Sequence, residues 1–115
     1  MHKMDFEEAI NIAKVIIKRF KKIEGKPWGA EGSMIELSKQ VGELSKLVMV
    51  REGYYFYDRV VGNEKYEATQ EKIGDELADI LYSVIRLADH YDIDLETAHI
   101  NARKGEDKLL RSKGV

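Results

Sequence analysis

Apolar residues recur with helical spacing in three stretches of this chain, and no other sequence feature constrains the fold as strongly. Within each stretch the steps between them alternate between three and four residues, which is typical of one helix face packed in a bundle. The three stripes are Phe6, Ile10, Ala13, Ile17 and Phe20; Met34, Leu37, Val41, Leu44 and Val48; and Ile73, Leu77, Ile80, Val84 and Leu87. The pattern predicts three long helices.

The composition agrees with an all-α fold. The chain has 115 residues and a single proline, and 43% of its residues are hydrophobic. A chain of this length is most simply one domain, so we expect a single helical domain over residues 1–115, with a C-terminal tail that frays from about residue 105. Apolar residues beside the main stripes, such as Leu47 and Val50, exceed what one slim bundle covers, which predicts an oligomer.

Charge and composition exclude several classes of function. A net charge of −2 and a pI near 5.9 argue against a nucleic-acid binder, which usually carries a basic face. The chain has no cysteine, which removes disulfides and thiolate chemistry. Its first residues are charged, and no apolar run approaches the ~18 residues of a membrane span. We therefore expect a cytoplasmic protein without nucleic-acid or membrane partners.

Capping signals place the ends of the helices. The first helix is expected to begin near Asp5, and Ser33 with Glu36 forms a capping box that predicts the start of the second. Gly53 is expected to end that helix. The third helix is expected to begin between Asn63 and Thr69 and to end near Tyr91, and a weaker fourth follows the turn at residues 92–95.

The aromatic stretch from Tyr54 to Tyr66 has no sustained period. An extended excursion, a bent helix and a lid are all compatible with it. Its aromatic side chains suit a nucleobase or a second subunit, and packing at an interface is the favoured role.

Two polar pairs occupy equivalent places on two of the predicted helices. Gln40 and Glu43 lie three residues apart, as do Glu76 and Asp79. With the apolar stripe at heptad positions a and d, both pairs fall at g and c. Acid pairs on helices are usually solvated, but side chains three apart share a side of the helix, so two facing pairs can converge. Converging carboxylates favour a hard divalent cation such as Mg²⁺, which in turn binds phosphates.

Other chemistries find less support. The sequence has no glycine-rich phosphate loop, and His2, His90 and His99 lack metal-ligand spacing. Ser83 has no histidine partner at a recognisable spacing, so it is interpreted as a packing residue and not as a nucleophile.

The segments Val41-Gly42-Glu43-Leu44 and Asp75-Glu76-Leu77-Ala78-Asp79-Ile80-Leu81 together resemble the MazG-like all-α nucleoside triphosphate pyrophosphohydrolases. The resemblance covers roughly Ser33 to Lys104. It implies a MazG-like helical bundle that assembles as a homodimer or homotetramer. It also implies hydrolysis of a nucleoside triphosphate to the monophosphate and pyrophosphate with Mg²⁺ or Mn²⁺.

The resemblance also implies roles for individual residues. Glu43, Glu76 and Asp79 would be metal ligands and catalytic residues. Asn101 and Lys104 lie where the last helix often contributes to phosphate binding. Trp28 follows Pro27 in a Pro-Trp pair similar to one found before the motif helix of some members. It is a candidate for stacking on the substrate, although an aromatic that closes a bundle end is the commoner case.

Gln40 departs from the family pattern, because the first motif glutamate falls on this position. An amide keeps a carbonyl oxygen that can coordinate a metal, but it carries no charge and cannot act as a base. Two alternatives to an enzyme therefore stay open. One is a catalytically impaired module that senses nucleotides or binds proteins, and the other is a plain helical scaffold with solvated acids.

Overall fold

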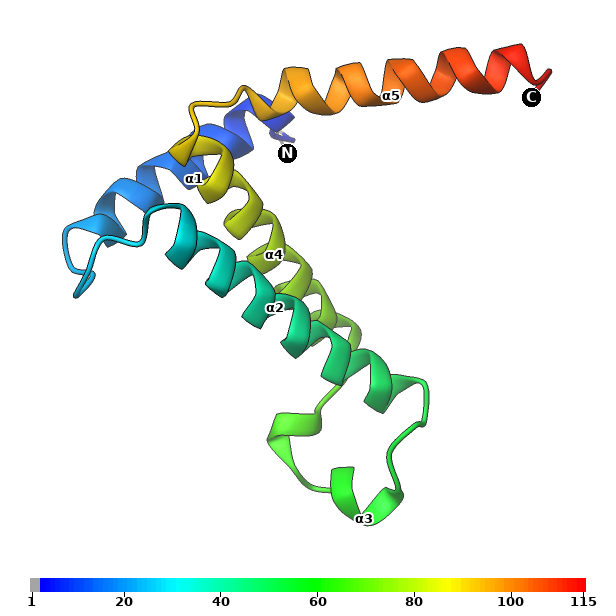
Figure 1. Cartoon of the computed structure of the whole chain (residues 1–115). Coiled ribbons are helices and arrows are strands. Elements are labelled where there is room, and N and C mark those ends of the chain that lie inside the picture. Colours follow the sequence, from blue (N-terminus) through cyan, green and yellow to red (C-terminus); the bar gives the residue numbers. More distant parts are fainter. Residues whose placement is uncertain (1–2) are drawn as a thin grey trace. The chain divides into compact units, whose positions relative to one another are not determined.

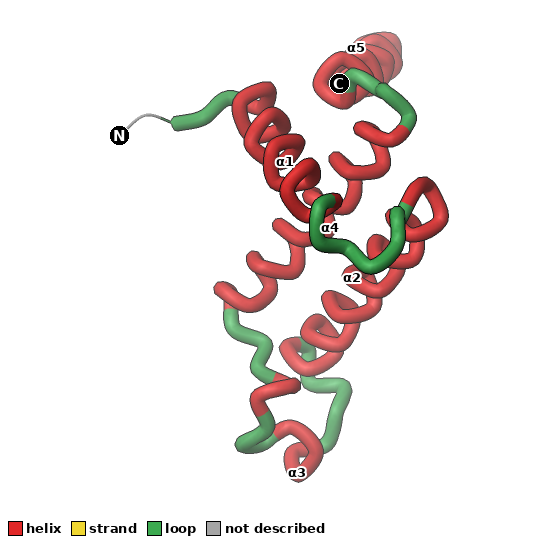
Figure 2. The backbone as a smooth tube through the Cα atoms, turned by 90° about the vertical axis from the view of Figure 1, so that its left-hand side faces the viewer, coloured by secondary structure: helices red, strands yellow, loops and turns green. Residues whose placement is uncertain are grey.

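The computed structural model describes residues 3–115, and every regular element in that range is helical. The elements in chain order are α1 (Phe6–Lys21), α2 (Gly29–Arg51), α3 (Tyr57–Val60), a 3₁₀ turn η1 (Glu64–Tyr66), α4 (Gln70–His90) and α5 (Leu95–Ser112). Figures 1 and 2 show helices joined by turns, with no strand in the described part of the chain. The predicted all-α class is confirmed.

The chain forms two compact units. The first contains the residues up to Lys26 together with Ile85–Val115, and the second contains Pro27–Val84. The first unit thus holds α1, the whole of α5 and the last turns of α4. The second holds α2, α3, η1 and most of α4.

In the first unit, an aspartate caps each helix start, and the predicted start of the first helix near Asp5 is confirmed. Asp5 Oδ1 accepts a hydrogen bond of 2.8 Å from the backbone N–H of Glu8 at the start of α1. Asp94 accepts from both the N–H and the hydroxyl of Thr97 and caps α5. Ile17 is fully buried and Ile10 nearly so, as the stripe on the first helix predicted.

The last helix is longer than the sequence indicated. α5 has 18 residues, against 16 in α1, and it includes the exposed residues 105–112. The expected fraying of this tail stays a prediction.

In the second unit, α2 begins one turn earlier than predicted. Ser33 is not its N-cap: the side chain is buried inside the helix, and its hydroxyl donates to the carbonyl of Gly29 at 2.8 Å. Trp28 occupies the cap position instead, with its side chain against Gly32, where an added Cβ would lie 2.6 Å from the Trp28 Cβ. The missing side chain at Gly32 is what lets the helix start there.

The other end of α2 agrees with the prediction. Gly53 takes φ +77° just after the helix, and the N–H of Tyr54 donates to the carbonyl of Met49 at 3.0 Å, a typical C-terminal closure. Arg51 donates to the carbonyl of Ala68 at 2.9 Å and ties the end of α2 to the segment before α4.

The connection between α2 and α4 is neither extended nor one bent helix. It holds α3 and η1, with Arg59 at its centre: the guanidinium lies 4.1 Å from the ring centroid of Tyr55 and donates to the hydroxyl of Tyr66 at 3.2 Å. Beyond it, Thr69 accepts from the N–H of Lys72, and α4 runs beside α2 (Figures 1 and 2). The bounds of α4 lie within one residue of those predicted.

The buried face of both long helices is rotated relative to the predicted stripe. Apart from the half-buried Val84, the stripe residues at heptad position a are exposed, and the g positions beside the d residues are covered instead. The exposed a residues are Met34, Val41, Val48 and Leu77, whereas the covered residues include Ser33, Leu37, Leu44 and Leu47 on α2 and Ile73, Ile80, Ser83 and Leu87 on α4. Each of these helices therefore has two apolar faces, one packed and one exposed in the single chain.

Candidate functional site

The two polar pairs lie on the neighbouring helices α2 and α4 of the second unit, and they are placed alike. In each pair the g residue, Gln40 or Glu76, is half-buried, and the c residue, Glu43 or Asp79, is exposed. Because the covered face includes the g positions, the g residue of each pair points towards the neighbouring helix. The c residue lies at the exposed edge of that face.

Glu76 is the most perturbed acid of this set. Its Oε2 atom is buried and has no hydrogen-bond partner. Burial raises the pKa of the Glu76 carboxyl, and the negative charges of Asp79 and Glu43 raise it further, while Lys46 acts in the opposite direction. The structure thus brings Glu43, Glu76 and Asp79 close enough for their charges to interact, and leaves one carboxylate oxygen without a counterpart.

Lys46 is a member of this cluster that the sequence analysis missed. Its Nζ lies 3.1 Å from Oε2 of Glu43 and 5.6 Å from the ring centroid of Tyr66. The available signal was its spacing, because a lysine three residues after a glutamate on a helix forms an ion pair with it.

Gln40 is engaged within its own helix. Its Nε2 donates to Oε1 of Glu36 at 3.0 Å, and the same oxygen pairs with Nζ of Lys39 at 3.4 Å. Glu36, expected to complete a capping box with Ser33, therefore anchors the amide of Gln40 instead. Since the amide nitrogen faces Glu36, the carbonyl oxygen is the atom left for other contacts.

The donor set suits a hard cation held loosely. Within residues 3–115, no three acidic or histidine side chains are gathered tightly enough to enclose a metal ion. Mg²⁺, however, is commonly held by one or two carboxylates together with waters and substrate phosphates. The unpaired oxygen of Glu76 and the mutual repulsion with Asp79 and Glu43 are what such a cation relieves, so these residues fit it.

Of the three candidate substrate-binding residues, Trp28 belongs to the second unit, and Asn101 and Lys104 belong to the first. Trp28 occupies the N-cap position of α2, and its side chain lies against Gly32. Asn101 and Lys104 lie on α5 in the first unit, and both are exposed. A role for any of the three in substrate binding stays a prediction.

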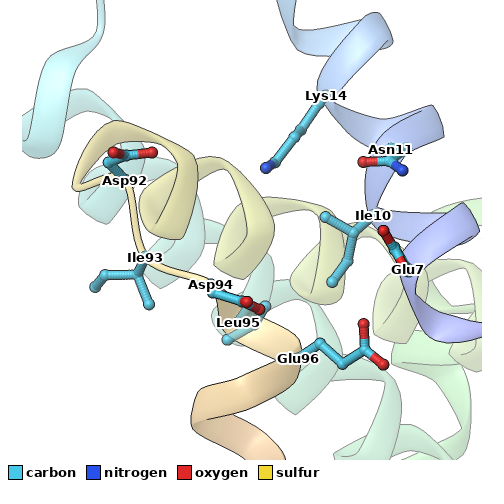
Figure 3. Close-up of a pocket in the computed structure, with 9 residues that line it drawn as sticks. All are labelled: Glu7, Ile10, Asn11, Lys14, Asp92, Ile93, Asp94, Leu95 and Glu96. Carbon is cyan, nitrogen blue, oxygen red and sulfur yellow. The ribbon is translucent and has the colours of Figure 1, made fainter.

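The first unit also contains a pocket of about 340 Å³ that the sequence did not indicate. Figure 3 shows it between α1 and the turn that leads into α5, with Lys14 and Asn11 on one side and the carboxylates of Asp94 and Glu96 on the other. The Asp94 carboxylate is held by Thr97, and these hydrogen bonds lower its pKa. This acid therefore has a structural task as a helix cap.

Comparisons of the chain with family models, with curated proteins and with solved structures give no match. In the described part of the chain, no helix combines the length and the apolar character that crossing a membrane requires.

Proposed function

We propose that this protein is a Mg²⁺-dependent nucleotide pyrophosphohydrolase of the MazG-like type. One observation carries the proposal: a buried carboxylate oxygen of Glu76 has no partner and lies within the electrostatic reach of Asp79 and Glu43. Perturbed acids of this kind are characteristic of functional sites. Both polar pairs also occupy the helix positions on which the resemblance to the family rests.

The proposed reaction splits the bond between the α and β phosphates of a nucleoside triphosphate. Water adds to a phosphorus atom, the bridging P–O bond breaks, and a nucleoside monophosphate and pyrophosphate leave. Mg²⁺ or Mn²⁺, when bound, neutralises phosphate charge and polarises the bond that breaks. Carboxylates from among Glu43, Glu76 and Asp79 would hold the cation, with the Gln40 carbonyl oxygen as a neutral ligand. The one of the three that the cation does not engage would accept the proton of the water.

The protein that performs this reaction is proposed to be a homodimer or homotetramer. The exposed apolar residues Met34, Val41 and Val48 recur every seven residues along α2, and Leu77 holds the same heptad position on α4. A second copy offers the same surface. Light scattering at micromolar concentration tests this point, and a monomer would contradict it.

Pyrophosphate release over a panel of nucleotides, with and without Mg²⁺ or Mn²⁺, tests the activity. Glu76→Gln and Asp79→Asn should each abolish metal-dependent release and weaken Mn²⁺ binding. Glu71→Gln, an exposed acid in the first turn of the same helix, is the matched control and should change neither. Unchanged Mn²⁺ affinity in both site variants would show that no shared cation site exists.

A second candidate is a module that binds nucleotides without efficient hydrolysis. It is favoured by Gln40, a neutral amide at the position of a carboxylate in the family pattern. The Gln40 amide is also hydrogen-bonded to Glu36. This candidate predicts nucleotide binding in the presence of Mg²⁺ by isothermal titration calorimetry, but no pyrophosphate release.

A further inference from the structure

Lys46 is a cation built into the acid cluster. Its ammonium group lies 3.1 Å from Glu43 and within reach of the face of the Tyr66 ring, and its charge opposes the rise in the pKa of Glu76. It therefore interacts with residues of α2, η1 and α4. A surface lysine that only paired along its own helix would not have three such neighbours.

The net charge of the cluster also favours a role for Lys46 in balancing the carboxylates. Gln40 is neutral, so the site offers three carboxylates, from Glu43, Glu76 and Asp79. One divalent cation and one ammonium group neutralise three carboxylates. With Lys46 in place, the cluster is balanced by a single divalent cation.

The contact between Lys46 and Glu43 is one that a metal ion can replace. It joins residues three apart on one helix, and the Glu43 side chain is 46% exposed, a setting in which ion pairs contribute little stability. Lysine carries its charge on a flexible four-carbon chain with three donors. The Tyr66 ring offers a neighbouring position with a favourable cation–π contact.

We propose that Lys46 holds Glu43 while the site is empty and becomes a ligand for a substrate phosphate when a divalent cation binds Glu43. This inference rests on the proposed function and extends it, because it assigns to α2 a phosphate-binding residue next to the acids. Lysine is a common phosphate ligand that acts as a point charge. The same displacement makes Lys46 a competitor of the metal.

Two binding measurements on the purified full chain test the proposal. The first is Mn²⁺ binding, followed by electron paramagnetic resonance, and the second is calorimetric titration of inorganic pyrophosphate at saturating Mg²⁺. They are made on the natural protein, on Lys46→Met and on Lys39→Met. Lys39 is the matched control, since it pairs with Glu36 on the same helix and is 62% exposed.

For Lys46→Met, we expect Mn²⁺ to bind about threefold to tenfold tighter, because a competing charge at a metal ligand is gone. We expect pyrophosphate to bind roughly tenfold weaker, the loss of one charge-assisted contact. Lys39→Met should leave both affinities unchanged. Unchanged affinities in Lys46→Met, with Mn²⁺ still bound by the natural protein, would overturn the inference and leave the proposed function intact.

Two other outcomes separate this inference from the proposed function. If only Lys46→Met binds Mn²⁺, Lys46 is a competitor as inferred, and the metal dependence proposed for the natural protein is wrong. If neither protein binds Mn²⁺, both proposals are wrong.

Discussion

Arg86 donates to the Glu24 carboxylate at 2.6 Å, across 62 residues of sequence, with both side chains almost shielded from water at 5% and 10% exposure. The pair joins the turn after α1 to α4 within the first unit. A second pair, Arg103 with Glu106, has the same distance between the same atom types, but its side chains are 54% and 60% exposed. The two pairs therefore differ in burial and in sequence separation, since Arg103 and Glu106 lie three residues apart on one helix.

The first prediction compares these pairs. Glu24→Ala removes the carboxylate from a buried ion pair and should lower the free energy of unfolding by about 3 kcal/mol, the low end of the range for buried pairs. Glu106→Ala should cost at most about 1 kcal/mol, because water screens the exposed pair. Urea denaturation measures both. Equal losses would show that the buried pair contributes no more to the free energy of unfolding than the exposed pair does.

The second prediction concerns Glu76 and pH in metal-free protein. Because its pKa is raised in the folded state, its contribution to stability is fully present below the unfolded-state value near ~4.3 and is lost as pH rises through the folded pKa. Glu76→Gln should therefore raise the melting temperature at pH 7 in EDTA and have less effect near pH 4. Saturating Mg²⁺ should reverse the order by stabilising the natural protein. A variant that melts lower at every pH in EDTA would contradict this reading of Glu76.

Helix existence was predictable from spacing alone, but the choice of buried face was not. Among the g positions beside the stripes only Leu47 is apolar, so spacing favoured the a–d side. These g positions hold Ser33, Gln40 and Leu47 on α2 and Glu76 and Ser83 on α4. The structure covers the g–d side and leaves Leu77 53% exposed. That choice depends on packing between segments distant in sequence, which a local pattern does not contain.

The start of α2 and the electrostatics of the site show the same limit. Ser33 has the residue type and spacing of an N-cap, yet α2 begins four residues earlier, at Gly29, where Trp28 lies against Gly32. The paired positions of Gln40 with Glu43 and Glu76 with Asp79 followed from spacing. The orphaned oxygen of Glu76 and the ring of Tyr66 beside Lys46 depend on tertiary placement.

The third prediction tests the glycine that sets this helix start. Gly→Ala inside a helix normally stabilises by about 0.5–1 kcal/mol. At Gly32 the added Cβ would lie 2.6 Å from the Trp28 Cβ, so Gly32→Ala should instead destabilise by about 1–3 kcal/mol, as overpacking does. Gly42, on the same helix, has no atom within 4 Å of an added Cβ, and Gly42→Ala should show the usual gain. Denaturant titrations that give both variants the same sign would exclude the Trp28 contact as the cause.

The last prediction concerns Gln40, where the enzyme and the binding module differ. We expect the natural protein to hydrolyse nucleotides slowly, since three carboxylates remain. Gln40→Glu places a second carboxylate beside Glu36, whose Oε1 now accepts a 3.0 Å hydrogen bond from the amide. Repulsion between the two should lower the melting temperature in EDTA, and Mg²⁺ should restore it. Turnover should rise, by as much as the ~10²–10⁴-fold associated with a positioned acid–base group.

Glu36→Gln with Gln40→Glu is the control for that repulsion. It removes the competing carboxylate and keeps the new one, so the loss of stability in EDTA should disappear while the gain in turnover persists. If the gain in turnover is lost in the double variant, Glu36 supplies a ligand of its own, one turn upstream of Gln40. A natural protein inactive on every nucleotide tested, whose Gln40→Glu variant hydrolyses them readily, would favour the binding module, because the neutral amide would then be the single change that silences an otherwise complete site.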